Sequence, residues 1–318
     1  MRALDWEVLE SARDWLHAGA GSWLCTIVSA VGSSPRPLGT LLACNERGEQ
    51  CGSLSGGCIE DDLLERISTG NMPDGPAHLI PYGVTAEQNE RLGLPCGGRL
   101  QVLVQRLEAS DIEWLDELLL ALSQRRCLRR EVNLHSGRTL LRTVTGFAPL
   151  VLTVERLIQT LGPRQRMLLV GAGQLSQSLA ELALAMDYEV FISEPRESAR
   201  QQWKGPPLPL IAGMPDDAVR EYITDPHSIV ITLTHDPRID DMALMEALES
   251  PAWYVGALGS RRTTEKRIER LHQLGLKEEQ IKALHAPVGL DIGSKTPLEI
   301  AVSIMAQLTA LQRRREAA

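Results

Sequence analysis

The chain has 318 residues, a formal net charge of −8 and an isoelectric point near 5.5. This length suggests two domains, and the acidic balance argues against a partner that is nucleic acid or an anionic membrane. No apolar run approaches the roughly 18 residues of a membrane span, and the N-terminus has no signal-peptide pattern, so we expect a cytoplasmic protein. The six cysteines form no CxxC pair, so we predict neither a zinc or other metal site nor a disulfide framework.

The first half of the chain mixes short strands, helices and loops of small residues. We predict helices over residues 5–17, 59–67 and 113–123, strands over 22–31, 40–44 and 99–105, and a hairpin over 128–144. This pattern predicts an N-terminal α/β domain with a mixed sheet over residues 1–150. Residues 151–164 are predicted to form a linker.

The pattern changes from residue 165, where short apolar runs alternate with helical stretches. Runs typical of strands buried on both faces cover residues 167–170, 189–192, 228–233 and 252–255. This alternation predicts a Rossmann-type, doubly wound parallel sheet over residues 165–318. Thr296-Pro297-Leu298-Glu299 is a capping box with proline at the first helical position, and it predicts a long final helix.

A glycine-rich turn follows the first of these strands. Gly171 permits a tight turn, and Gly173 lets the backbone approach a pyrophosphate. The helix that begins at about Gln174 would offer its first N–H groups to an anion. Ser176 stands where the third glycine of the GxGxxG pattern would be. The turn therefore predicts a nucleotide or phosphate ligand, although the glycines could also serve only to shape the turn.

Polar residues follow the other strands of the predicted sheet. Glu194 comes 23 residues after Gly171, where an acidic side chain can hold a ribose hydroxyl, and Arg196 beside it could instead meet a phosphate. His235 and Asp236 end the third strand. Gly259, Ser260 and Arg261 form a further turn that would suit an anion. We predict that all these residues contribute to cofactor binding.

Two cysteines lie in loops rather than in strands. Cys58 follows two glycines and begins a helix pattern, where the helix dipole stabilises a thiolate. Cys96 lies between Pro95 and two glycines. Because glycine-flanked loops often carry function, we predict chemical roles for Cys58 first and Cys96 second.

The motifs in these loops resemble those of a known family. The loops SSPRPLG (33–39), GSLSGGCIE (52–60) and LPCGG (94–98) look like the N-terminal motifs of the XdhC/CoxI family. Its C-terminal Rossmann domain is similar to the segments LLVGAG (168–173), EPR (194–196), LTHD (233–236), GALGSRRT (256–263) and PVGLDIGSKTPLEIAVSI (287–304). The resemblance covers nearly the full chain in order. Ser176 and Glu194 depart from the family pattern, in which glycine and aspartate are usual.

The resemblance implies a function as a chaperone rather than as an enzyme. Members of the family bind molybdenum cofactor as cargo, as molybdopterin or its dinucleotide form. They support its sulfuration with a cysteine desulfurase and deliver it to a xanthine dehydrogenase-like apoenzyme. A second copy of the chain, in a homodimer, is a further partner that we consider. The alternative, suggested by the glycine turn alone, is an NAD(P)-dependent oxidoreductase with His235 as its acid–base group.

Overall fold

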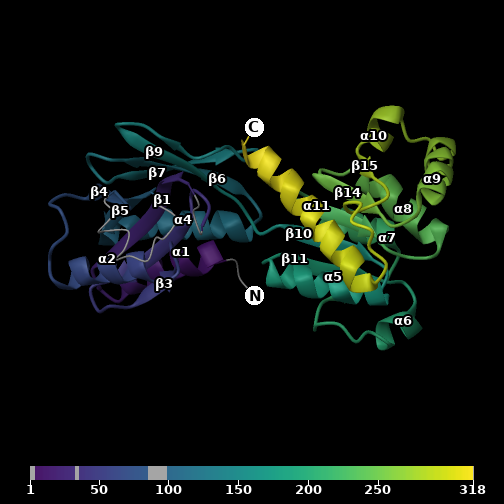
Figure 1. Cartoon of the computed structure of the whole chain (residues 1–318), viewed down its shortest axis with the longest axis horizontal. Helices are drawn as coiled ribbons and strands as arrows, with labels where there is room; N and C mark the ends of the chain where they lie inside the picture. The colour runs from purple at the N-terminus through teal and green to yellow at the C-terminus, as the bar shows by residue number, and fades with distance from the viewer. Residues whose placement is uncertain (1–3, 33–35, 85–98, 318) are drawn as a thin grey trace. The chain divides into compact units, whose positions relative to one another are not determined.

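The computed structural model describes residues 4–32, 36–84 and 99–317. The chain divides into two compact units, residues 2–163 and residues 164–318. Each unit builds hydrophobic clusters from its own helices and strands, which Figure 1 labels. No helix in the described ranges is long and apolar enough to cross a membrane.

The N-terminal unit contains a five-stranded sheet in the order β3-β2-β1-β5-β4. Its strands are β1 (Ser22–Val31), β2 (Leu41–Asn45), β3 (Gln50–Gly52), β4 (Ala77–Tyr82) and β5 (Arg99–Leu107). The described residues of this unit also form the helices α1 (Leu4–His17), α2 (Cys58–Ser68) and α4 (Ile112–Ser123). A short 3-10 turn, η1 (Ala109–Asp111), precedes α4. Alternation along the strands sends Leu24 toward α1 and α4, and the next residue, Cys25, toward α2. Both faces of this sheet are therefore buried.

A second sheet completes this unit and corrects the predicted domain boundary. Its strands are β6 (Cys127–Asn133), β7 (Thr139–Val144), β8 (Val151–Leu152) and β9 (Arg156–Leu161), in the order β7-β6-β9-β8. Residues 151–164 are therefore not a linker, because β9 pairs with β6 along its whole length and buries Leu157 and Leu161. The α/β class is confirmed, but all the pairings in both sheets are antiparallel rather than mixed.

The C-terminal unit is the predicted doubly wound parallel sheet. Its strands are β10 (Arg166–Val170), β11 (Glu189–Ser193), β12 (Leu210–Ile211), β13 (Ser228–Thr232), β14 (Tyr254–Ala257) and β15 (Leu284–His285). All pairs are parallel, in the order β12-β11-β10-β13-β14-β15. The chain order of the strands reverses between β10 and β13, and such a switch point is where open α/β sheets bind ligands at the carboxyl ends of the strands.

Helices cover both faces of the parallel sheet. On one face pack α5 (Gln174–Ala185) and α11 (Pro297–Ala317), which crosses the strands in yellow in Figure 1. On the other face pack α7 (Pro215–Tyr222), α8 (Pro237–Ala247) and α9 (Arg261–Gln273), while α6 (Glu197–Gln201) and α10 (Glu278–Lys282) are short. The predicted capping box forms at the start of α11, where the Thr296 N–H donates to Glu299 at 2.9 Å and the Glu299 N–H to the Thr296 hydroxyl at 3.3 Å.

Candidate functional site

The turns that follow β10 and β13 meet at the switch point of the parallel sheet. Gly171 has a φ of +104°, a backbone conformation that L side chains rarely adopt. A Cβ at this position would lie 2.8 Å from the Cγ2 of Thr234, in the turn after β13. Gly171 is therefore required by its backbone conformation, as predicted for a tight turn, and also by the close approach of the second turn, which the sequence did not predict.

The start of α5 is open. Gly173 is exposed, and a Cβ placed on it would meet nothing within 4 Å. Gln174 begins the helix and is also exposed, and no side chain caps the first N–H groups of α5. These N–H groups have no acceptor within the helix, so they are free to bind an anion placed over Gly173.

Ser176 lies beneath the turn rather than at its surface. Its side chain is fully buried, and its hydroxyl donates to the Gly171 carbonyl at 2.6 Å. The small side chain permits the close packing that the third glycine usually provides, and the hydrogen bond closes the turn. Ser176 thus supports the turn and does not face a ligand.

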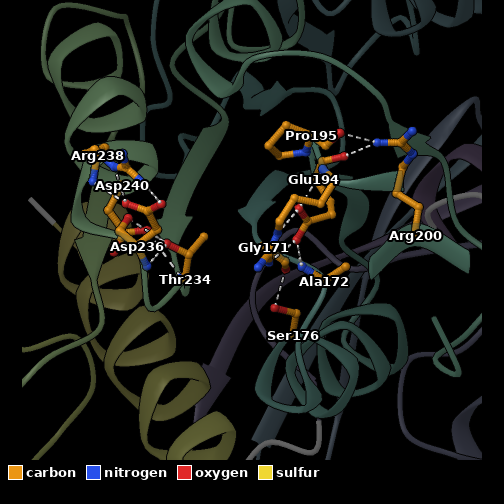
Figure 2. A network of polar contacts seen from close by, with 11 residues as sticks. Gly171, Ala172, Ser176, Glu194, Pro195, Arg200, Thr234, Asp236, Arg238 and Asp240 are labelled. Atoms are coloured by element: carbon orange, nitrogen blue, oxygen red, sulfur yellow. Dashed lines mark hydrogen bonds and ion pairs between the residues drawn. The ribbon is translucent and has the colours of Figure 1, made fainter. Parts of the chain in front are cut away.

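Glu194, directly after β11, binds the glycine turn, as Figure 2 shows. It also binds Arg196, two residues further along the chain. Its carboxylate accepts hydrogen bonds from the N–H of Ala172 at 3.1 Å and the N–H of Arg196 at 3.0 Å, and it pairs in bidentate fashion with the Arg196 guanidinium. Burial alone would raise the pKa of Glu194, but the hydrogen bonds from Arg196 and Ala172 outweigh burial and lower it. The carboxylate is therefore ionised and occupied by protein donors.

A second arginine braces the same turn. Arg200 Nη1 donates to the backbone carbonyls of Glu194 at 2.6 Å and Pro195 at 2.7 Å. Figure 2 shows this side chain reaching back to the turn after β11. The backbone just before Arg196 is thus held in place by Arg200.

The turn after β13 holds His235 at the surface and uses Asp236 as a helix cap. Asp236 accepts from the Arg238 N–H at 3.0 Å and pairs with the Arg238 guanidinium at 2.9 Å. A buried ion pair packs against this turn, between Asp240 Oδ2 and Arg267 Nη2 at 3.0 Å. Asp240 also accepts from the Thr234 hydroxyl at 2.7 Å. His235 is exposed at the edge of the sheet, as expected of a residue available to a ligand.

Gly259, Ser260 and Arg261 follow β14, the next strand along the same edge. Ser260 caps α9 by accepting from the Thr263 N–H at 3.1 Å, so this helix start is already partly satisfied. The Arg261 side chain is 87% exposed, and the carboxylate that pairs with it, that of Asp291, lies 3.9 Å away. This turn is therefore a weaker anion site than the uncapped start of α5.

In the N-terminal unit, Cys58 is exposed at the first position of α2. The preceding loop folds around the buried carboxylate of Glu60, whose oxygens accept from the hydroxyls of Ser53 and Ser55 and from the N–H groups of Leu54, Ser55, Gly56 and Gly57. Burial alone would raise the pKa of Glu60, but these hydrogen bonds, those of Ser55 foremost, hold it far below its usual range. The loop that presents Cys58 is thus fixed by a carboxylate two residues further along the chain.

The other described cysteines are less exposed than Cys58. Cys25, Cys44 and Cys127 are buried and Cys51 is half-buried. Cys96 lies outside the described residues. Within the described ranges, no group of three or more His, Cys, Asp or Glu side chains is arranged to hold a metal ion.

Comparison with known proteins identifies the family. A model described as the XdhC Rossmann domain matches residues 167–308, and one described as the XdhC and CoxI family matches residues 15–81. The chain belongs to the XdhC and CoxI family. Its two matched segments fall on the two units, one on each.

Several known proteins are similar to the chain along most of its length. It is 27% identical over 316 residues to a probable xanthine dehydrogenase subunit from Bacillus subtilis, covering 92% of this chain and 93% of that one. It is 28% identical over 320 residues to the molybdenum cofactor insertion chaperone PaoD of Escherichia coli, covering 97% and 89%. A crystal structure from Bacillus halodurans, described as a xanthine dehydrogenase, matches with a TM-score of 0.74 at 25% identity, covering 98% of this chain and 96% of that one.

Some residues of these sites were not singled out from the sequence, namely Glu60, Arg200, Asp240 and Arg267. The signal for Glu60 was available, because an acidic residue three positions after a small-residue loop is a capping-box pattern. Asp240 and Arg267 are 27 residues apart and meet only through the packing of α8 on α9.

Proposed function

We propose that this protein is a molybdenum cofactor insertion chaperone that holds the cofactor as cargo for a xanthine dehydrogenase-like apoenzyme. Its family and the name of its relative PaoD support this role. The structural observation that supports it best is the uncapped start of α5, with open space over Gly173. Helix N-termini of this kind bind phosphate.

The cargo and the site agree in their chemistry. Molybdenum cofactor ends in a phosphate, or in a pyrophosphate and nucleoside in its dinucleotide form, and either group suits N–H donors in a Gly171–Gly173 turn. The opposite end of the cofactor is a sulfur-rich metal centre, for which a cysteine thiolate is a suitable soft ligand. We therefore assign the phosphate end of the cofactor to the turn of the C-terminal unit, and we propose a separate chemical role in sulfuration for Cys58. Sulfuration with a cysteine desulfurase as partner is part of the same proposal.

Activation of a xanthine dehydrogenase-like apoenzyme tests this role. The protein, loaded with molybdenum cofactor under anoxic conditions, is expected to restore activity to the apoenzyme. The variant Gly173→Val is expected to fold normally, by circular dichroism, and to restore little activity because its side chain occupies the phosphate position. Equal activation by both proteins would contradict the assigned site.

The alternative of an NAD(P)-dependent oxidoreductase is favoured by two features, the strand order of the sheet and the exposure of His235 at its edge. A steady-state assay of NAD⁺ reduction with simple alcohols and hydroxy acids separates the two functions. A chaperone leaves NAD⁺ unreduced. Turnover that disappears in His235→Ala would establish the oxidoreductase instead.

A further inference from the structure

The carboxylate of Glu194 has no acceptor capacity left for a ligand. A carboxylate offers about four lone-pair positions. Here Oε1 accepts from the Arg196 N–H at 3.0 Å and from its Nε at 2.8 Å, and Oε2 accepts from the Ala172 N–H at 3.1 Å and from Arg196 Nη2 at 2.9 Å. The side chain is also only 1% exposed. A ribose hydroxyl could bind Glu194 only by displacing one of these donors.

The guanidinium of Arg196, unlike the Glu194 carboxylate, keeps hydrogen-bonding capacity for a ligand. Its side chain is 59% exposed, and Glu194 uses only Nε and Nη2. No described residue accepts a hydrogen bond from Nη1, so one edge of the guanidinium is available to solvent or to a ligand. Its orientation is fixed because the bidentate pair and the Arg196 N–H are all held by one buried carboxylate.

The charges around Arg196 favour an anion at this end of the crevice. The buried member of the Glu194–Arg196 pair is the anion and the exposed member is the cation. The other carboxylate close enough to act on Arg196, Asp236, is itself paired with Arg238 at 2.9 Å. Arg200 adds a second cation beside the backbone carbonyls of the same turn.

We propose that the crevice end at β11 recognises a phosphate group through Arg196 rather than a ribose diol through Glu194. Glu194 is then a positioning residue that orients Arg196 and ties it to the Ala172 N–H of the glycine turn. This inference rests on the proposed function, because it specifies the class of ligand for the same crevice.

A pair of probes that differ only in one phosphate tests the proposal. NADP⁺ carries a phosphate on the ribose hydroxyl that a dinucleotide-binding sheet presents to the end of its second strand, whereas NAD⁺ does not. We expect the full-length protein to bind NADP⁺ about tenfold or more tightly than NAD⁺ in calorimetric titration, as a charge-assisted contact provides. Arg196→Met is expected to abolish this difference. Arg220→Met, which removes a half-exposed arginine paired with carboxylates elsewhere in the same unit, should preserve it.

Glu194→Gln distinguishes the two assignments. If Glu194 positions Arg196, this variant weakens NADP⁺ binding and leaves NAD⁺ binding little changed. If Glu194 holds the ribose, it weakens NAD⁺ binding, and that result would overturn the inference. Equal affinity for both dinucleotides in the wild type, or no binding of either, would overturn it too. Molybdenum cofactor retention that depends on Gly173 would then show that the proposed function survives without this phosphate contact.

Discussion

Two glycines of the same turn respond differently to a side chain. Gly171 combines a φ of +104° with Thr234 at 2.8 Å, whereas Gly173 has an ordinary φ of −88° and open space above it. We predict that Gly171→Ala lowers the free energy of unfolding by about 1–3 kcal/mol, because strain of this kind costs that much. Gly173→Ala should change it by less than about 0.5 kcal/mol. Urea denaturation measures both, and equal losses would contradict this account of the turn.

Alanine substitutions at Cys58 and Cys25 compare a cysteine with a proposed chemical role and a cysteine that only packs in the core. Cys58 is exposed at the start of α2 and Cys25 is fully buried in β1. We predict that Cys58→Ala unfolds like the wild type but fails to activate the apoenzyme, and that Cys25→Ala loses about 1 kcal/mol or more from its cavity and still activates it. Iodoacetamide should label Cys58 faster than Cys25 in the intact protein. A normally active Cys58→Ala variant would contradict the chemical role proposed for this residue.

For single residues, the neighbouring sequence was enough to predict the structure at some positions and not at others. The sequence predicted that Cys58 follows a loop and begins a helix and that Gly171 makes a tight turn, because both follow from adjacent residues. It left open whether Glu194 holds a ribose hydroxyl or Arg196 meets a phosphate, and the structure fills the Glu194 carboxylate with donors from Ala172 and Arg196. That outcome depends on side-chain conformations, which the spacing of charged residues does not determine.

At the scale of elements, the loop before α2 depends on one carboxylate. The buried side chain of Glu60 satisfies four consecutive backbone N–H groups, those of residues 54–57. We predict that Glu60→Gln lowers the free energy of unfolding by about 1–3 kcal/mol, because an amide nitrogen would face donors that need an acceptor. Glu65→Gln, on the exposed side of the same helix, is the control and should have little effect.

Because of the Glu60 carboxylate, we also predict that the free energy of unfolding depends on pH. The pKa of Glu60 is lowered in the folded protein and is about 4.3 in an unfolded chain. Its stabilisation is therefore complete above about pH 4.3 and is lost as the pH falls toward the folded value. Urea denaturation between about pH 5 and about pH 3 should show a steeper loss in the wild type than in Glu60→Gln. Parallel pH profiles would contradict the assigned role.

The helices and strands that the sequence predicted are those in which apolar residues recur at a regular spacing. The strand over 22–31, the helix over 113–123 and the first strand of the parallel sheet all agree with the structure to within about a residue. The two-residue strands β12 and β15 are too short to show any period, and they form only because β11 and β14 offer them an edge. The segment RLIQTL of β9 was missed, because its partner β6 lies more than twenty residues earlier in the chain.

At the scale of the whole molecule, the boundary between the two units lies after Pro163. A fragment of residues 2–163 is predicted to fold, because it keeps β9 between β6 and β8. A fragment of residues 2–150, which ends at the boundary expected from the sequence, should be unfolded or aggregated because β6 loses a partner and Leu157 and Leu161 leave the core. Circular dichroism and gel filtration of the two fragments compare them directly. If both fragments fold equally well, β9 does not belong to this unit.

We propose that this protein holds molybdenum cofactor as cargo through the glycine turn of its C-terminal unit. The most direct test is the molybdenum and pterin content of the protein purified under anoxic conditions, measured by elemental analysis and by mass spectrometry of the extracted ligand. The wild type is predicted to retain cofactor, and Gly173→Val, equally folded, is predicted to retain little. Wild-type protein that carries neither molybdenum nor pterin after exposure to the cofactor would contradict the claim.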